Sequence, residues 1–314
     1  MLRVFKTDTA TKQVKKIKKI TVDSWIELTS PTKDEIEKVV AKTNVDIDLI
    51  TKMLDTEELP RVEQSNNAIL IVIDTPYLEG EQEEHKYTTY PLGIIISSNN
   101  YVITVSPKKT KILDDFKLNK IQDFRSAKKT RFLIQILLKT SSYYLRALKE
   151  VNADIEAKEQ VLKKSTKNDD LIDLLDIEKT LVYFITSLKA NEAVLEKLNK
   201  GTMVTLYEND KDLLEDAVIE NKQAIEMTGI YKNILNSISN TYETIASNNL
   251  NNAMKFLAGI TIVLSIPTMI SSFLGMNIPL GSITNDNNAF VIITSISLVI
   301  SIIIALLLKH KDML

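Results

Sequence analysis

The most restrictive feature of this chain lies in its last sixty residues, which contain two long uncharged stretches. No charged residue occurs between Lys255 and Asp286, and none occurs between Asp286 and Lys309. A helix of about 20 apolar residues is long enough to cross the hydrocarbon core of a bilayer. Two such helices fit here, over 256–274 and 289–308. The sequence therefore predicts a large water-soluble region followed by two membrane crossings.

The positive charges around these stretches predict an orientation. The connection 277–288 contains no Lys or Arg, whereas Lys255 precedes the first stretch, and Lys309 and Lys311 follow the second. Cytoplasmic segments carry an excess of Lys and Arg. The N-terminus also lacks the apolar core of a secretory signal. We therefore expect a multi-pass protein of the cell membrane with both termini in the cytoplasm.

Composition excludes several classes of site. The chain has no Cys and two His, so thiolate zinc sites, thiol catalysis and a histidine-rich metal cage are excluded. Its net charge of −2 argues against a general nucleic-acid binder. No phosphate-binding loop and no pair of nucleophile and base emerges, so an enzyme is the least favoured class. A local basic run favours an edge strand blunted by lysines over a binding patch, and it comprises Lys12, Lys15, Lys16, Lys18 and Lys19.

The soluble region changes character at about residue 107. Before this point, β-type runs over 2–6, 14–20, 68–74, 88–97 and 101–105 alternate with turns, and Asn99-Asn100 suits a tight hairpin. Ser30-Pro31 predicts the N-cap and first residue of a helix, and a second short helix is expected over 45–54. An α/β domain is therefore predicted for 1–107.

Long helices are predicted after Pro107, because no further proline occurs before Pro267. Breaks are expected near 164–168 and 201–209. The last helix has no strong stop between about Asp210 and Gly275, and about 65 residues would extend roughly 100 Å. The predicted organisation is a helical region over 108–208, a stalk over 209–255, a first membrane helix over 256–277, an outer loop over 278–288, and a second membrane helix with a basic tail over 289–314.

Small or polar residues mark one face of the stalk as it enters the first span. Steps of three and four place them on a single side of a helix. They are Asn251, Met254, Ala258, Thr261, Ser265, Thr268, Ser272 and Gly275. Hydroxyls in a membrane helix face protein or water in preference to lipid. Periodicity alone leaves close helix packing and pore lining equally open.

Three short motifs resemble the CorA family of divalent-metal channels. Gly275-Met276-Asn277 ends the first span, 251–255 looks like the segment where the family's stalk enters the membrane, and 60–63 looks like its Pro-Arg-x-Glu signature. The layout of α/β domain, long helices and two C-terminal spans covers essentially the whole chain. The resemblance implies a homopentamer in the lipid bilayer whose first spans surround a central pore.

The resemblance also implies roles for individual residues. Gly275, Met276 and Asn277 would form the outer mouth, where five Asn277 carboxamides face a hydrated ion. Asn251 would form an inner polar ring, and Met254 with Leu257 a hydrophobic constriction. The resemblance implies pore-lining roles for Ala258, Thr261, Ser265, Thr268 and Ser272, which lie along the stripe. The implied cargo is Mg²⁺, with Co²⁺, Ni²⁺ and Zn²⁺ as alternatives, and no cofactor and no nucleic acid are implied.

The sequence departs from the family pattern in its expected regulatory position. The family closes when cytosolic Mg²⁺ binds between subunits, in part through a stalk acid about eleven residues before the inner Asn. That position is Asn240 here, and Glu243, one turn away, is the candidate substitute. The outer loop offers Asp286 as its one acid.

Two other interpretations stay open. The chain resembles the family's zinc-handling relatives as well, although the absence of Cys and His from the pore favours Mg²⁺. A membrane-anchored coiled-coil sensor or scaffold would use the two spans only as an anchor. That alternative assigns no special role to Asn277.

Overall fold

The computed structural model describes residues 1–80, 86–162, 168–201, 203–276 and 288–311. It divides into two compact units, Met1–Ser237 and Ile238–Leu314. Each unit is described by itself.

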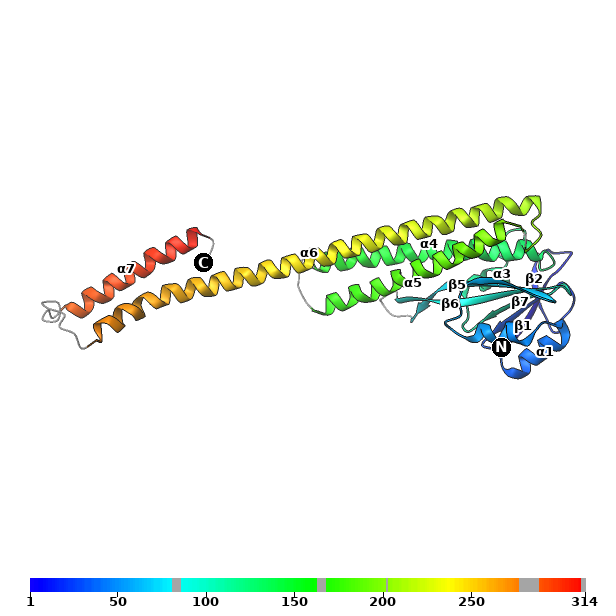
Figure 1. Ribbon diagram of the computed structural model, residues 1–314, viewed down its shortest axis with the longest axis horizontal. Coiled ribbons are helices and arrows are strands. Elements are labelled where there is room, and N and C mark those ends of the chain that lie inside the picture. Colours follow the sequence, from blue (N-terminus) through cyan, green and yellow to red (C-terminus); the bar gives the residue numbers. More distant parts are fainter. Residues whose placement is uncertain (81–85, 163–167, 202, 277–287, 312–314) are drawn as a thin grey trace. The chain divides into compact units, whose positions relative to one another are not determined.

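The first unit is built on a seven-stranded mixed sheet (Figure 1). The strand order is β2-β1-β3-β7-β6-β5-β4, and β3 and β7 are parallel while the other pairs are antiparallel. The strands are β1 (Leu2–Thr7), β2 (Val14–Ile17), β3 (Trp25–Thr29), β4 (Arg61–Ser65), β5 (Ala68–Glu79), β6 (Lys86–Ser97) and β7 (Val102–Ser106). Both edge strands, β2 and β4, are short.

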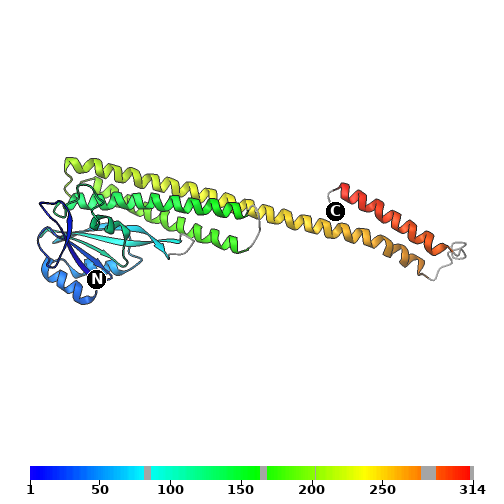
Figure 2. The ribbon, with the colours of Figure 1, turned by 180° about the vertical axis from the view of Figure 1, so that it is seen from behind.

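Helices cover both faces of this sheet, and each face has its own apolar core (Figures 1 and 2). One face is covered by α1 (Lys33–Thr43), α2 (Ile47–Thr51) and the 3-10 turn η1 (Lys52–Leu54). The other is covered by α3 (Lys111–Lys117), α4 (Lys129–Leu162), α5 (Asn168–Asn199) and the first part of α6 (Glu208–Leu274). This second core is centred on Trp25, whose ring contacts four phenylalanines and whose Nε1 donates to Thr104 Oγ1 at 2.9 Å.

The predicted hairpin turn between β6 and β7 is confirmed, and Asn100 has the positive φ (66°) that such a turn requires. Two strands, β3 and β4, were missed. The expected N-cap at Ser30 was wrong, because the cap is Thr32, whose hydroxyl accepts from the Glu35 amide while the Glu35 carboxylate accepts from the Thr32 amide. Ser30 instead has a positive φ of 41° and donates its hydroxyl to the Pro107 carbonyl at 2.8 Å.

Helix α6 begins against α4 and α5 and continues without a break through the first apolar stretch. Arg131 donates to the Asp210 carboxylate at 2.9 Å, and Asn221 donates to the Leu188 carbonyl at 3.0 Å. These contacts fix the start of α6 in the first unit. The prediction that one helix serves as both stalk and first span is confirmed.

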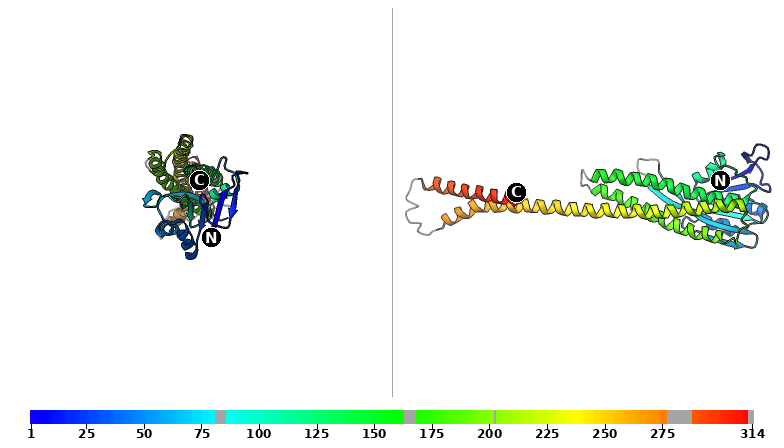
Figure 3. Two further views of the ribbon diagram at one scale, coloured as in Figure 1. Left: turned by 90° about the vertical axis from the view of Figure 1, so that its right-hand side faces the viewer. Right: turned by 90° about the horizontal axis from the view of Figure 1, so that it is seen from above.

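The second unit contains the end of α6 and α7 (Ala289–His310). Among the residues that the structure describes, α6 and the segment Phe290–His310 are long and apolar enough to cross a membrane. Helix α7 runs back alongside the end of α6 (Figures 1 and 3). The two predicted spans are therefore both helical in the described residues.

A buried carboxyl group lies where the sheet meets α5. Asp74 Oδ2 accepts a hydrogen bond from Ser187 Oγ at 2.6 Å, and Ser187 also lies 3.0 Å from Thr89 Oγ1. Asn191 makes hydrogen bonds of 2.9 and 2.8 Å to the Asp74 main chain. Burial raises the pKa of Asp74, and the Ser187 hydrogen bond opposes this only in part. No cation pairs with Asp74 in the part of the chain that the structure describes.

This raised pKa predicts how stability depends on pH. The folded state holds the Asp74 proton more tightly than the unfolded chain, so stability falls as pH rises from the unfolded to the folded pKa and stays lower above it. Asp74→Asn removes the ionisation. We expect it to raise the free energy of unfolding at pH 7.5 and to change it less at pH 4.

Thermal unfolding of the full chain across this pH range measures the effect. The matched control is Asp216→Asn, which neutralises an exposed carboxylate on α6. An equal loss of stability for Asp74→Asn at both pH values would contradict the burial argument.

Candidate functional site

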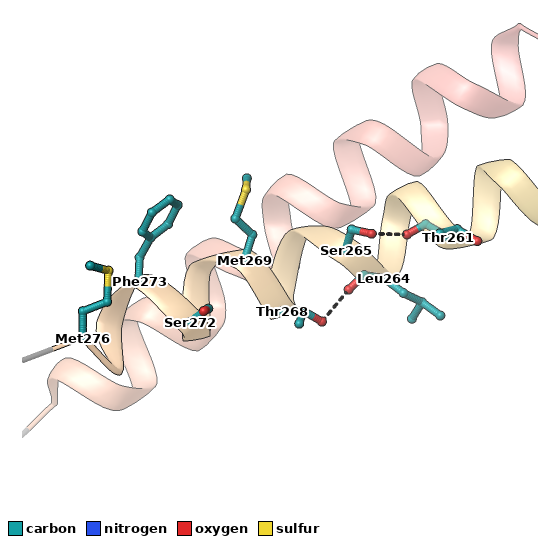
Figure 4. A pocket seen from close by; sticks show the side chains of 8 residues that line it. All are labelled: Thr261, Leu264, Ser265, Thr268, Met269, Ser272, Phe273 and Met276. Atoms are coloured by element: carbon teal, nitrogen blue, oxygen red, sulfur yellow. Dashed lines mark hydrogen bonds between the residues drawn. The ribbon is translucent and has the colours of Figure 1, made fainter.

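The candidate site is one face of α6 within the second unit. The side chains of Thr261, Ser265, Thr268 and Ser272 are all exposed on it, although they lie in the most apolar part of the helix. Figure 4 shows them together with their neighbours along a shallow groove of about 530 Å³. The groove is lined by Thr261, Leu264, Ser265, Thr268, Met269, Ser272, Phe273 and Met276. The predicted polar stripe is therefore a real surface of the helix.

The hydroxyl groups on this face donate to their own helix. Thr261 Oγ1 donates to the Leu257 carbonyl at 2.8 Å, Ser265 Oγ to the Thr261 carbonyl at 2.7 Å, and Thr268 Oγ1 to the Leu264 carbonyl at 3.0 Å. A hydroxyl group has one donor and two acceptor lone pairs. Because the donor is used within the helix, each oxygen presents acceptor capacity outward. A face of this kind suits a partner that donates hydrogen bonds.

Helix α7 covers a different side of α6. The least exposed residues of the span recur at steps of three and four, and they are Gly259, Ile260, Val263, Ile266, Pro267, Ile270 and Leu274. At roughly 100° per residue, this set points away from the hydroxyl face. The hydroxyl face is therefore not covered by the second span of the same chain.

Small residues on α7 form its side of this contact. Ser297 and Ser301 are 7% and 8% exposed, and Ile293, Ile304 and Ala305 on the same face are partly covered. Small side chains let two helix backbones approach closely. In this chain, α6 packs against α7 on one side and presents an uncovered polar face on the opposite side. The packing residues on α7 were not predicted, although Ser297, Ser301 and Ala305 recur every four positions.

Pro267 lies inside α6 on its less exposed side, next to Thr268 in the chain. Proline has no backbone N–H, so the helix loses one internal hydrogen bond there. The Thr268 hydroxyl supplies a hydrogen bond to the neighbouring Leu264 carbonyl. The helix continues past Pro267 to Leu274.

The predicted outer mouth is only partly described. The Gly275 amide donates to the Ser271 carbonyl at 3.0 Å, and Met276 is exposed. A Cβ added to Gly275 would meet backbone oxygens at 3.5 and 3.6 Å, which is ordinary contact, so packing within one chain does not require glycine here. Asn277 and Asp286 lie outside the described residues.

The cytoplasmic end of the predicted stripe is exposed in the single chain. Asn251, Met254, Leu257 and Ala258 are all exposed, as is the candidate regulatory residue Glu243. No group of three or more His, Cys, Asp or Glu side chains that could hold a metal occurs in the described part of the chain. Three apolar residues that line the groove, Leu264, Met269 and Phe273, were missed, since apolar side chains in a span carry no distinguishing signal.

The Pro-Arg-x-Glu motif has a structural role in the first unit. The Arg61 guanidinium pairs with the Glu58 carboxylate, donates to Glu63 at 3.0 Å, and donates to the Leu59 carbonyl at 3.3 Å. Both acidic partners raise the pKa of Arg61 against the effect of burial. The interactions of Arg61 therefore stabilise the conformation of the segment that leads into edge strand β4.

The fold and the hydroxyl face of α6 together define an integral membrane protein with a large α/β unit. The first span of this protein carries an oxygen-rich surface that the second span of the same chain does not cover. The family described as "CorA-like Mg2+ transporter protein" matches residues 23–310. The cobalt/magnesium transport protein CorA of Methanocaldococcus jannaschii is 26% identical over 296 residues, which cover 91% of this chain and 90% of that relative.

Solved structures give the same assignment. The complete structure of the CorA magnesium transporter from Methanocaldococcus jannaschii has a TM-score of 0.85 at 25% identity and covers 98% of this chain and 96% of that one. The cytoplasmic domain of ZntB from Vibrio parahaemolyticus has a TM-score of 0.58 at 10% identity, covers 78% of this chain and 98% of that one, and shows similarity of fold alone. The chain belongs to the CorA-like Mg²⁺ transporter family, and it is a membrane transporter of the CorA class.

The α6–α7 contact yields a stability prediction. Ser301→Leu places a larger side chain in a covered position, and overpacking typically costs about 1–3 kcal/mol. Ser295→Leu is the matched control, because Ser295 is exposed on the same helix and makes the same kind of hydrogen bond to a backbone carbonyl. We expect thermal unfolding in detergent to show a lower transition temperature for Ser301→Leu only. Equal transition temperatures for both variants would contradict the packing.

Proposed function

We propose that the chain forms a homopentameric channel in the cell membrane that conducts a hydrated divalent cation, Mg²⁺ in the first place, into the cytoplasm. One observation carries the proposal: the hydroxyl acceptors of α6 lie opposite the face that α7 covers. Exposed acceptors in hydrocarbon are unfavourable, so this face requires water or another polar partner. Five such faces around a common axis would line a wet passage.

The chemistry of the face suits an ion that keeps its water. Mg²⁺ dehydrates reluctantly, and its bound water molecules are hydrogen-bond donors. Thr261, Ser265 and Thr268 offer acceptors because their own hydrogens are used within the helix. Neutral oxygens bind the aquo ion weakly enough to release it, as conduction requires. Co²⁺ and Ni²⁺ are divalent ions that the same hydroxyls could hold through water.

The outer mouth would consist of Gly275, Met276 and Asn277 from each copy. The contacts within the chain leave room for a Cβ at Gly275. If glycine is needed there, the reason would be the close approach of a neighbouring copy or of the ion. Asn277 carboxamide oxygens would accept hydrogen bonds from the aquo ion. Residues 278–288 would form the outer loop.

The inner end of the path would be formed by Asn251 as a polar ring and by Met254 with Leu257 as a constriction. All three side chains are exposed in the single chain, which leaves them available to line a common axis. Glu243 would replace the missing acid at Asn240 as a regulatory metal ligand from neighbouring copies. No enzymatic step and no bound cofactor is assigned.

Membrane potential would drive the flux. Both chain ends are assigned to the cytoplasm, in keeping with Lys255, Lys309 and Lys311 at the inner ends of the spans. One elementary charge gains about 2.3 kcal/mol in crossing 100 mV, and a divalent ion gains roughly twice that on entering a negative interior. Transport then needs no nucleotide hydrolysis.

Influx into proteoliposomes tests this function. With a fluorescent Mg²⁺ indicator inside and an imposed negative interior, we expect Asn277→Ala to reduce influx by about tenfold or more, equivalent to at least about 1.4 kcal/mol in the barrier. Asn285→Ala, the same chemical change in the outer loop, is the matched control. The potential should also set the rate, since entry is passive.

Equal influx for the wild type and Asn277→Ala would remove the transport proposal. Membrane insertion of both variants, checked by extraction into detergent, separates loss of flux from loss of protein. The same assay with Zn²⁺ replacing Mg²⁺ would favour the zinc alternative if Zn²⁺ alone entered.

A further inference from the structure

A second groove lies in the first unit, between α1 and the first two strands. Its volume is about 900 Å³. Apolar side chains of β1 and of the segment that continues from β2 contribute Leu2, Val4, Ile17 and Ile20. The basic residues that line it are Arg3, Lys16, Lys18, Lys19, Lys38 and Lys42, of which Arg3 and Lys16 direct their side chains to the opposite face of the sheet. Among the residues that the structure describes, no acidic residue lines it.

The fold brings these two kinds of side chain together from separate elements. Val4 and Ile17 are directly paired across β1 and β2, so they lie on the same face of the sheet. Lys38 and Lys42 are one turn apart on α1 and therefore lie on the same side of that helix. Lys16 pairs with Phe5 and therefore lies on the other face of the sheet. The lysines that border this apolar surface are Lys18 and Lys19, which follow β2, together with Lys38 and Lys42.

The positive charge in this groove is largely uncompensated. In the described part of the chain, Lys16, Lys18, Lys19, Lys38 and Lys42 form no ion pair, and all five are exposed. Arg3 is paired with Glu27 at 2.9 Å. The nearby Glu35 carboxylate is occupied by the Met1 amino group at 2.9 Å and by the Leu2 amide at 2.8 Å. The ammonium groups of Lys18, Lys19, Lys38 and Lys42 repel one another, and an anion among them would relieve the repulsion.

Protection of an edge strand accounts for only part of this charge. Lysines on β2 discourage pairing with another strand. Lys38 and Lys42 belong to a helix, so that explanation does not reach them. Strand addition would use the outer edge of β2, whereas this groove lies on the sheet face beside α1.

We propose that this groove binds a small organic polyphosphate, of which a nucleoside triphosphate is the representative. Its volume falls within the range of small-molecule sites, about 300–1,000 Å³. Lysine binds phosphate as a point charge, and the partly exposed side chains of Leu2, Ile17 and Ile20 offer apolar contact for a planar ring. The proposal is independent of the transport function.

A link to transport follows if both proposals hold. A nucleoside triphosphate loses part of its negative charge when it chelates Mg²⁺. A groove that attracts its ligand by positive charge therefore prefers the metal-free form. The occupancy of the groove then rises as the cytosolic Mg²⁺ concentration falls. Binding in the groove would therefore report low Mg²⁺ to the first unit.

Titration calorimetry with ATP tests the binding. The full chain in detergent, with a chelator present to remove Mg²⁺, is compared with the double variant Lys38→Gln/Lys42→Gln. The matched control is Lys33→Gln/Lys111→Gln, which removes two exposed helix lysines outside the groove. We expect the Kd for ATP to rise by about tenfold or more in the first variant and by less than about twofold in the control. The difference between the two variants measures the contribution of the Lys38 and Lys42 charges.

Two further measurements sharpen the test. Binding should weaken as salt is raised, because the attraction is between charges. Inorganic triphosphate should bind more weakly than ATP, because it cannot use the apolar surface. Equal affinity of the two anions would overturn the part of the proposal that concerns the ring.

Three results would overturn the proposal. These are no ATP binding at millimolar concentration, an equal loss in both double variants, or binding to vesicles of anionic phospholipid that depends on Lys38 and Lys42 and is not displaced by ATP. Because the readout is binding, its failure is distinguishable from a failure of the flux experiment.

Discussion

The structure of the membrane region depends on how polar groups find hydrogen-bond partners where there is no water. In hydrocarbon, an unsatisfied hydrogen-bonding group is costly, so a membrane helix must satisfy its hydroxyls internally or place them against protein or water. Helix α6 does the first with its donors, which bond to backbone carbonyls one turn back. The acceptor lone pairs still face outward. Since α7 lies on the other side, those lone pairs need a partner that the described part of the chain does not supply.

The first unit treats its buried polar groups in the same way. Glu27 is 2% exposed in the middle of the sheet, and it is accompanied by Arg3 at 2.9 Å and Lys117 at 2.8 Å. Asp74 lacks a cation and relies on Ser187, with a raised pKa as the consequence. In each case the partner comes from another element, so these groups specify which elements meet. Burying a charge without such a partner would destabilise the fold.

The sequence was most informative where a pattern is local. The two uncharged stretches, the continuous helix between the first unit and the first span, and the Asn99-Asn100 turn all follow from nearby residues. The cap of α1 was also within reach, since Thr32 and Glu35 form a capping box, but Ser30-Pro31 gave a competing signal. Ser30 is placed instead by its bond to the Pro107 carbonyl, a contact between residues far apart in the chain.

Strand β3 was missed for a related reason. Its central residue is Glu27, and a charged residue within a short apolar run favours a turn over a buried strand. The residues that pair with Glu27, Arg3 and Lys117, lie far from it in the sequence. The polar stripe on α6 was predicted by spacing, yet spacing could not separate packing from pore lining. The position of α7 shows that packing within the chain occurs on the other side of α6. No local signal joined Lys38 and Lys42 to the basic run on β2, because only the fold brings them to one groove.

The most direct test of the central claim is the water accessibility of single cysteines along α6. The chain has no native cysteine, so a thiol placed at Thr261, Ser265 or Thr268 is the only one present. A charged, water-soluble thiol reagent is applied to the protein in membranes. We expect labelling at these positions, slowed by Mg²⁺, and no labelling of cysteines at Val263, Ile266 or Ile270. Protection of the hydroxyl face in every condition, or equal labelling of both faces, would contradict it.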